Sequence, residues 1–334
     1  ICVYFGLINK EEFVWWLTGL YYLRLFIMIM YSFSLYFPKI TFSLPRNIGS
    51  ILTYSFYIFL AGSAASILID IDKFMIPQKE AISQTAFYAV AVFIATVIEI
   101  PGRAMFQIIN PLVAKALNEN NIKELSNLYS KSSINLLIVA GLFFLLININ
   151  IEPFYNLMSN PSYGDAIWVV LMISTSKLIL MSFGCGPAIL ATAKFYKITL
   201  PFSILMAIAV YFLNDILIDI YSINGAALST LIVVFIFTVL KIWYIKIKLN
   251  ISPYSTNSIK VLASILVVFF LLNSFDLKLN SILEIAVNTF VILFLYLIII
   301  YKLEASKAIN SFINNLFRGA VSYTHLTLPT IDRV

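Results

Sequence analysis

The chain has 334 residues, of which 61% are hydrophobic, 15% are aromatic and only 11% are charged. Soluble domains carry about a quarter charged residues, so the polar side chains here are too few to cover so much apolar surface in water. The composition therefore excludes a soluble enzyme, a nucleic-acid-binding protein and a disordered scaffold, and the net charge of +6 needs an explanation other than nucleic acid.

The apolar segments predict an all-α fold, a polytopic membrane helix bundle. The opening ICVYFGLI resembles the last turns of an apolar helix, so we expect an upstream part of the protein to be missing. A bilayer core about 30 Å thick requires about 20 mostly apolar residues per helix. The runs are too long and too uniformly apolar for an outer-membrane β-barrel. About nine segments qualify: 13–37, 48–70, 84–111, 133–151, 163–192, 196–214, 222–245, 258–275 and 281–301.

The positions of Lys and Arg predict how these segments are oriented. The loops between nine spans alternate between two sides of the membrane, and cytoplasmic loops are enriched in Lys and Arg. One side carries fifteen of these residues, whereas the other carries only Lys10, Lys73, Lys79 and Lys278. We therefore expect a cytoplasmic C-terminus, and the basic excess follows from topology rather than from an acidic partner.

Residues 114–132, AKALNENNIKELSNLYSKS, combine charged side chains with apolar ones near helical spacing. This pattern predicts an amphipathic helix that lies on the cytoplasmic surface and links two spans. A plain polar loop is the alternative.

Two cations lie in the middle of predicted spans, where an ionisable group is costly and usually faces a bundle interior or a wet cavity. Arg24 lies in YYLRLFIMI and Lys177 in MISTSKLIL, and neither has an acid within a helical turn of its own segment. Both are candidates for lining a cavity that receives an anionic headgroup. The alternative is that each pairs with an acid on a neighbouring helix or extends to an interface.

Glu99 and Arg103 are four residues apart, in the order that favours an ion pair along a helix. They flank Pro101 and Gly102, and a proline inside an apolar span bends the helix and frees a backbone carbonyl. The group is either a structural pair near the cytoplasmic end or a hinge used in alternating access. We therefore treat the two charged residues as cavity candidates, and Pro101 and Gly102 as hinge candidates.

Three further hinge candidates, Gly184, Gly186 and Pro187, interrupt the span that contains Lys177. Interrupted helices near charged groups are typical of transporter sites.

Asp70 and Asp72 lie at the outer end of a span, in SILIDIDKFMI. Residues two apart point to different faces of a helix, so the carboxylates are not expected to share a catalytic proton. We expect Asp72 to face the cavity or to cap the loop, and a solvated helix end is the alternative. At another outer end, Asp215 and Asp219 are expected to be solvated.

Two cysteines far apart in sequence, Cys2 and Cys185, indicate neither a disulfide framework nor a zinc site. The single histidine, His325, lies in VSYTHLTLPT, which resembles the in-frame translation of a sequencing-library transposase adapter. We therefore expect residues 321–334 to be non-native, with an ordinary cytoplasmic tail as the alternative. Without this histidine there is no imidazole for a metal site or a catalytic triad, and no cofactor is expected.

Three features follow one another between Ser50 and Phe235. One span ends in Asp70 and Asp72, the next begins with YAVA at 88–91 and ends at Asn110-Pro111, and a later one begins with INGAA at 223–227. In this order and spacing they resemble the polysaccharide-biosynthesis branch of the multidrug/oligosaccharidyl-lipid/polysaccharide exporter superfamily, as found in bacterial lipid-linked oligosaccharide flippases.

The resemblance implies two lobes with twelve to fourteen helices, of which this chain would supply helix six onward. It predicts the end of the first lobe and a linker at 1–47, a second six-helix lobe at 48–245, and two additional helices with a cytoplasmic end at 246–320. A chain without most of the first lobe is not expected to complete a transport cycle alone.

The function that the resemblance implies is a flippase of the bacterial inner membrane, which moves a lipid-linked oligosaccharide for surface polysaccharide by alternating access. Its expected partners are a polyprenyl-diphosphate-linked oligosaccharide, membrane lipid and polysaccharide assembly proteins, and no nucleic acid. One alternative is a cation-coupled multidrug exporter of the same fold. Another is a membrane oligosaccharide polymerase or ligase, which short outer loops disfavour. A purely structural membrane subunit is the last alternative.

Overall fold

The computed structural model describes residues 10–37, 47–158, 161–274, 279–311 and 313–314. Over these residues the chain is helical and has no strand. The predicted adapter-derived tail at 321–334, with His325, lies outside the described residues. An all-helical chain agrees with the composition, because a helix bonds its own backbone polar groups and leaves none unpaired in lipid.

Seven helices within the described residues are long and apolar enough to cross a membrane, and a shorter apolar helix covers Ile48–Ala64. The chain is therefore a multi-pass helical membrane protein. The helices and short 3-10 segments are α1 (Lys10–Leu35), α2 (Ile48–Lys79), α3 (Ile82–Thr96), η1 (Val97–Glu99), α4 (Ile100–Asn118), α5 (Ile122–Asn156), η2 (Pro161–Ala166), α6 (Ile167–Ser182), α7 (Gly186–Thr192), η3 (Tyr196–Ile198), α8 (Thr199–Leu249), α9 (Thr256–Asn273) and α10 (Ser281–Lys302).

The helix α8 has 51 residues but is not straight, because the backbone of Ser222 is non-helical, with φ 53° and ψ −136°. The Nζ of Lys241 lies 3.3 Å from the Sδ of Met206, 35 residues earlier. In a straight helix these residues would be about 52 Å apart. The chain therefore reverses near Ser222 and forms two antiparallel arms, 199–221 and 223–249. Glycine at Gly225 permits this approach, because a Cβ there would overlap the carbonyl of Leu217. The seven-helix count takes both arms as one helix, whereas the sequence predicts two spans here.

The chain divides into two compact units, Ile1–Leu52 and Thr53–Val334. The first unit contains α1, whose apolar side chains are mostly exposed within that unit. The second unit contains α3 to α10, so α9 and α10 belong to the same compact unit as the predicted six-helix lobe.

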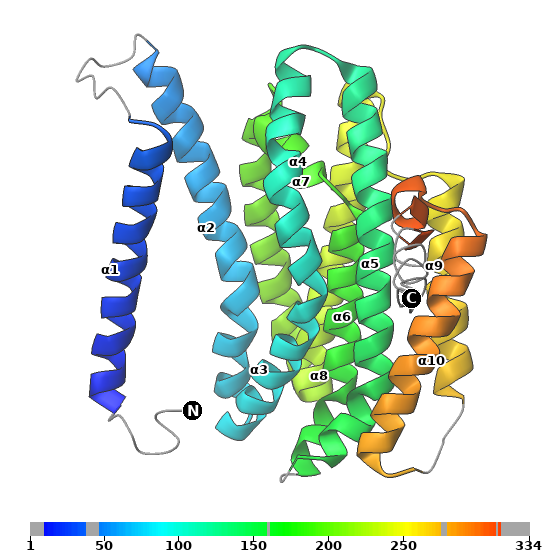
Figure 1. Cartoon of the computed structure of the whole chain (residues 1–334). Helices are drawn as coiled ribbons and strands as arrows, with labels where there is room; N and C mark the ends of the chain where they lie inside the picture. Colours follow the sequence, from blue (N-terminus) through cyan, green and yellow to red (C-terminus); the bar gives the residue numbers. More distant parts are fainter. Residues whose placement is uncertain (1–9, 38–46, 159–160, 275–278, 312, 315–334) are drawn as a thin grey trace, which may run out of the picture. The chain divides into compact units, whose positions relative to one another are not determined.

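The helix α5 is the centre of the second unit, where α4, α6, α9 and α10 all pack against it (Figure 1). The attachment of α10 includes a hydrogen bond of 3.0 Å from the Tyr296 hydroxyl to the carbonyl of Ile138. Close approach depends on Gly141, because a Cβ at this position would lie 2.8 Å from the Tyr296 hydroxyl and would also overlap Ile265. The absence of a side chain at Gly141 therefore allows the two additional helices, α9 and α10, to pack closely on α5.

The prediction of a separate surface helix at 114–132 was wrong. These residues form the end of α4, a turn in which Asn120 has φ 52°, and the start of α5. Leu125 and Tyr129 are fully buried in a cluster with Ile189 of α7. The amphipathic pattern reflects burial against a neighbouring helix of the protein rather than contact with a membrane surface.

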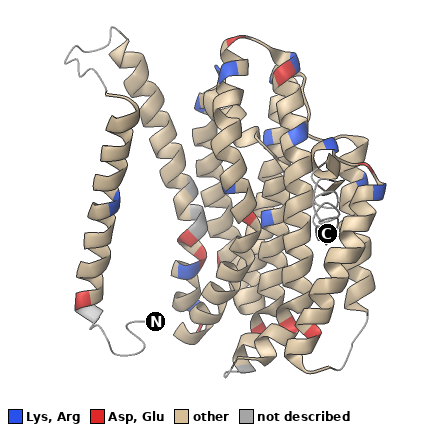
Figure 2. Cartoon of the chain, viewed as in Figure 1, with Lys and Arg blue, Asp and Glu red and all other residues tan. Residues whose placement is uncertain are grey.

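In the second unit, Lys and Arg gather at the end where α4 passes into α5 (Figure 2). A cluster of basic residues at one end is what the alternation of basic loops predicts. Which side of a membrane this end faces stays a prediction.

Candidate functional site

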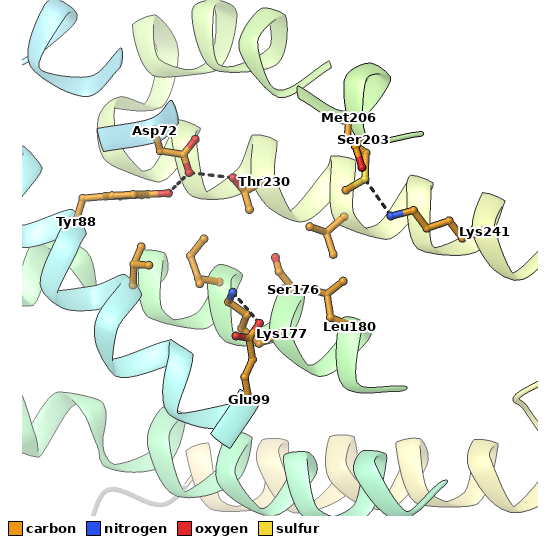
Figure 3. A pocket seen from close by; sticks show the side chains of 13 residues that line it. Asp72, Tyr88, Glu99, Ser176, Lys177, Leu180, Ser203, Met206, Thr230 and Lys241 are labelled. Atoms are coloured by element: carbon orange, nitrogen blue, oxygen red, sulfur yellow. Dashed lines mark hydrogen bonds and ion pairs between the residues drawn. The ribbon is translucent and has the colours of Figure 1, made fainter. Parts of the chain in front are cut away.

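Side chains from α2, α3, η1, α6 and α8 line a cavity of about 260 Å³ within the second unit (Figure 3). Each of the longer walls is a stripe at helical spacing. The second arm of α8 supplies Thr230, Val234 and Lys241, and positions four and eleven residues apart lie on one face of a helix. The stripe at 173, 176, 177 and 180 of α6 follows the same rule, as do positions 88, 92 and 99 of α3 and η1.

Asp72 of α2 lies at one end of this cavity and is only 3% exposed. One of its oxygens accepts a hydrogen bond from the Asn214 amide at 2.6 Å. The other accepts a hydrogen bond from the Thr230 hydroxyl at 3.0 Å and one from the hydroxyl of Tyr88. The alternative that Asp72 lies at a solvated helix end is therefore wrong, because its side chain is buried.

Asn214, which donates to Asp72, is itself held by a hydrogen bond from a further residue. The hydroxyl of Ser229 donates a hydrogen bond to the Asn214 carbonyl oxygen, and both residues are fully buried. This bond fixes the amide orientation, so that the Asn214 NH₂ group faces the carboxylate. Three helices, α2, α3 and both arms of α8, are joined by a polar network around one acid. Among the described residues no cation forms an ion pair with Asp72.

Lys177 of α6 lines the same cavity and pairs with Glu99 of η1, with 2.8 Å between Nζ and Oε1. Both side chains are largely buried, at 16% and 19% exposed. The predicted pair between Glu99 and Arg103 is also present but longer, at 3.9 Å, and Arg103 is 70% exposed. For Lys177 the sequence left open a pair with an acid on a neighbouring helix, and the structure contains this pair, with Glu99 as the acid.

Lys241 is the second cation of the cavity, and the sequence had placed it in a cytoplasmic loop. Its only hydrogen bond in the described part of the chain goes to the sulfur of Met206, a weak acceptor. No carboxylate pairs with it among these residues. It lies eleven residues after Thr230 on the same stripe, which is about 16 Å along the helix axis. The cavity therefore has an acid at one end and an uncompensated ammonium toward the other.

The first group of hinge candidates lies where a helix changes its type. The chain passes from the 3-10 turn η1 into α4 at Ile100, so that Pro101 occupies the first turn of α4, where its missing N–H costs little. Gly102 is buried, and a Cβ there would lie 2.5 Å from the sulfur of Met181 on α6. The interruption is present, and its use as a hinge stays a prediction.

The second group separates α6 from α7. Gly184 has φ +58°, and a Cβ there would lie 2.6 Å from the backbone nitrogen of Ser133. Gly186 and Pro187 begin α7. Gly184 has a left-handed backbone conformation and lies against α5, so the structure contains a well-defined turn at this position. Movement about it is likewise a prediction.

Three predicted residues lie elsewhere. Arg24 is exposed on α1, in the first unit, and its role in a cavity stays a prediction. Asp215 and Asp219 are exposed but not merely solvated, because Lys79 of α2 pairs with them at 2.7 Å and 2.9 Å. The hydrogen bonds that Lys79 donates to these two residues raise the pKa of its ammonium.

Four of the residues around the cavity were not predicted from the sequence as cavity residues: Tyr88, Asn214, Thr230 and Lys241. A helical stripe of polar side chains on an otherwise apolar span, such as 230 and 241, is the signal that could have identified them. No group of three His, Cys, Asp or Glu side chains in the described ranges could hold a metal ion.

No protein-family model, no curated protein and no solved structure matches this chain. The resemblance of residues 50–235 to oligosaccharide flippases therefore stays a prediction drawn from the motifs.

Proposed function

We propose that this chain is part of an exporter that flips a lipid-linked oligosaccharide by alternating access. The anionic diphosphate of the lipid would enter the cavity, and its polyprenyl tail would remain in the bilayer. In this proposal the chain crosses the bacterial inner membrane nine times, with its C-terminus in the cytoplasm, and works together with polysaccharide assembly proteins.

The observation that carries the proposal is the cationic side of the cavity. Lys241 is half-buried, lines the cavity and has no carboxylate partner among the described residues. An ammonium in a low-dielectric surrounding is costly unless an anion pairs with it. A diphosphate offers charge-assisted hydrogen bonds, which are about twice as strong as neutral ones. Lys177 adds a second ammonium on the facing wall, although Glu99 holds it.

A binding measurement tests the proposal directly. The chain in phosphatidylcholine nanodiscs is titrated with farnesyl diphosphate and, separately, with the neutral alcohol farnesol. We expect the diphosphate to bind and Lys241→Gln to weaken its binding by at least about tenfold, since a charge-assisted hydrogen bond is lost. Lys123→Gln, an exposed position with the same change of charge, is the matched control. Equal binding of diphosphate and alcohol, or no effect of Lys241→Gln, would refute the proposal.

A cellular experiment tests transport. In the complete protein, Lys177→Gln is expected to reduce surface polysaccharide while membrane insertion stays normal. Normal polysaccharide in this variant would remove Lys177 from the mechanism.

Asp72 supports a second candidate, a cation-coupled multidrug exporter. A buried carboxylate that accepts hydrogen bonds only from neutral donors, as far as the described residues extend, is a group that could exchange a cation. Saturable binding of ethidium that Asp72→Asn removes, together with no binding of farnesyl diphosphate, would favour this candidate over the flippase.

A further inference from the structure

Glu99 pairs with two cations that come from different helices. Lys177 of α6 lies 2.8 Å from one carboxylate oxygen, and Arg103 of α4 lies 3.9 Å from the other. The close partner is largely buried and faces the cavity, whereas the distant partner is mostly exposed. The same acid therefore belongs to an inner pair and to an outer pair at once.

The inner pair determines what an entering anion meets. Of the two ammonium groups that line the cavity, the one on Lys241 lacks a carboxylate partner in the described residues, while the one on Lys177 is already neutralised by Glu99 (Figure 3). An anionic headgroup can pair with Lys241 immediately. It can pair with Lys177 only in competition with the carboxylate of Glu99.

The outer pair makes this exchange feasible. Removing one partner of a buried ion pair is strongly unfavourable when the other charge is left without compensation. Arg103 is one helical turn beyond Glu99, and its exposed side chain has the freedom to shorten the 3.9 Å separation. Glu99 would thus keep a cation after it releases Lys177.

A change of partner at Glu99, from Lys177 to Arg103, also affects the backbone joint beside the cavity, which is the junction of η1 and α4. Glu99 is the last residue of η1, and α4 begins at the next residue, Ile100, followed by Pro101 and Gly102. The ion pair between Glu99 and Lys177 therefore connects this junction to α6, and we refer to it as the tie. When this ion pair opens, the start of α4 keeps its apolar contact with α6, in which Gly102 lies against Met181.

We infer that Glu99 is an internal competitor of the transported anion. Its carboxylate occupies Lys177 while the cavity is empty, and the entering headgroup displaces it onto Arg103, which releases the joint at Pro101 from α6. This inference rests on the proposed function, because it requires the cavity to bind an anion. It assigns Glu99 a specificity role: only an anion able to outcompete a carboxylate would open the tie.

The farnesyl diphosphate titration in nanodiscs tests the inference with charge-neutral variants. Glu99→Gln removes the competitor, so we expect it to tighten binding by about three- to fivefold, the size expected when an ion pair no longer has to be broken. The tightening should vanish in a Lys177→Gln background, since the cation that Glu99 occupies is then absent. Glu119→Gln is the matched control, because it makes the same charge change at an exposed site and should leave the affinity unchanged.

Hydrogen exchange supplies a second readout that a purely structural role would not produce. In the parent chain, farnesyl diphosphate should increase amide exchange over residues 97–104, because displacement of Glu99 loosens the joint. In Glu99→Gln this segment should already exchange faster without ligand, and the ligand should add little.

The possible results separate the two proposals. If the diphosphate binds through Lys241 but Glu99→Gln binds it equally or more weakly, the competitor role is overturned and the proposed function stands. Equal tightening by Glu119→Gln would also overturn it, because the effect would then be one of net charge. If neither the parent chain nor Glu99→Gln binds the diphosphate in a Lys241-dependent way, both proposals are refuted.

Discussion

The polar network around Asp72 offers the sharpest test of the structure. Asn214 is fully buried and is the only residue that both donates to the Asp72 carboxylate and accepts from Ser229 in the described network. Asn214→Leu keeps a similar side-chain volume but removes both interactions. The carboxylate then has one oxygen without its donor, and the Ser229 hydroxyl loses its acceptor.

The expected cost follows from the kind of each bond. A hydrogen bond to a charged group contributes about 1.5–3 kcal/mol, and the 2.6 Å bond to Asp72 belongs to this class. Hydrogen bonds between neutral side chains of membrane helices average only about 0.6 kcal/mol, which applies to the bond with Ser229. We therefore expect Asn214→Leu to lower the free energy of unfolding by about 2–3.5 kcal/mol, with most of the loss due to Asp72.

Equilibrium unfolding by sodium dodecyl sulfate in mixed micelles, followed by helical circular dichroism, measures this difference. Asn118→Leu is the control, because Asn118 is exposed at the end of α4 and should change the stability by less than about 0.5 kcal/mol. Ser229→Ala should also cost less in the Asn214→Leu background than in the parent chain, since its acceptor is already gone.

A stability of Asn214→Leu within about 0.5 kcal/mol of the parent chain would refute the reasoning. It would mean that the carboxylate does not depend on Asn214, either because water replaces the amide or because the three helices do not meet at Asp72. Equal costs of Ser229→Ala in both backgrounds would contradict the layered arrangement.

Three further predictions concern the backbone, the packing and the orientation. Gly184→Ala should lower the free energy of unfolding by about 2 kcal/mol or more, because Gly184 has φ +58° and faces the backbone of Ser133. Gly164→Ala is the control, since this glycine has open space around it, and it should leave the free energy of unfolding unchanged. Equal stabilities of the two variants would contradict the turn at Gly184. Gly141→Leu should cost about 1–3 kcal/mol by forcing α9 and α10 away from α5, and Gly62→Leu, which meets no neighbour, is its control in the same unfolding assay. In the complete protein freed of its native cysteines, single cysteines at Lys123 and Lys246 should react with an impermeant maleimide from the same side of the membrane, and labelling from opposite sides would contradict the predicted topology.

The sequence by itself determined the class of this protein, because the reasons are local. Runs of about 20 apolar residues have to be helices in lipid, whatever lies beside them. The same holds for the breaks at Pro101 and at Gly184 to Pro187, where the residue types limit the backbone directly. Glu99 and Lys177 were recognised for a comparable reason, since a charge within an apolar span is visible without knowing its neighbours.

Only the tertiary structure decided which of these groups meet. The pair between Glu99 and Lys177 joins η1 to α6, and the network of Asp72 joins residues 142 and 158 positions apart. Periodicity assigns a face to a residue but does not say which helix that face meets. For this reason the sequence predicted Glu99 with Arg103, its neighbour along the chain, rather than with Lys177.

The same limitation explains Lys241 and the segment 114–132. Lys241 lies near the end of a predicted span, so counting charges assigned it to a loop, while the folding back of α8 at Ser222 places it in the cavity beside Met206. The apolar side of 114–132 was assigned to a membrane surface, although it is buried against α7. For 114–132 the pattern showed correctly that one side of the helix needs apolar neighbours, whereas for Lys241 it did not indicate an enclosed position. In both cases long-range packing decided which part of the molecule surrounds the side chain.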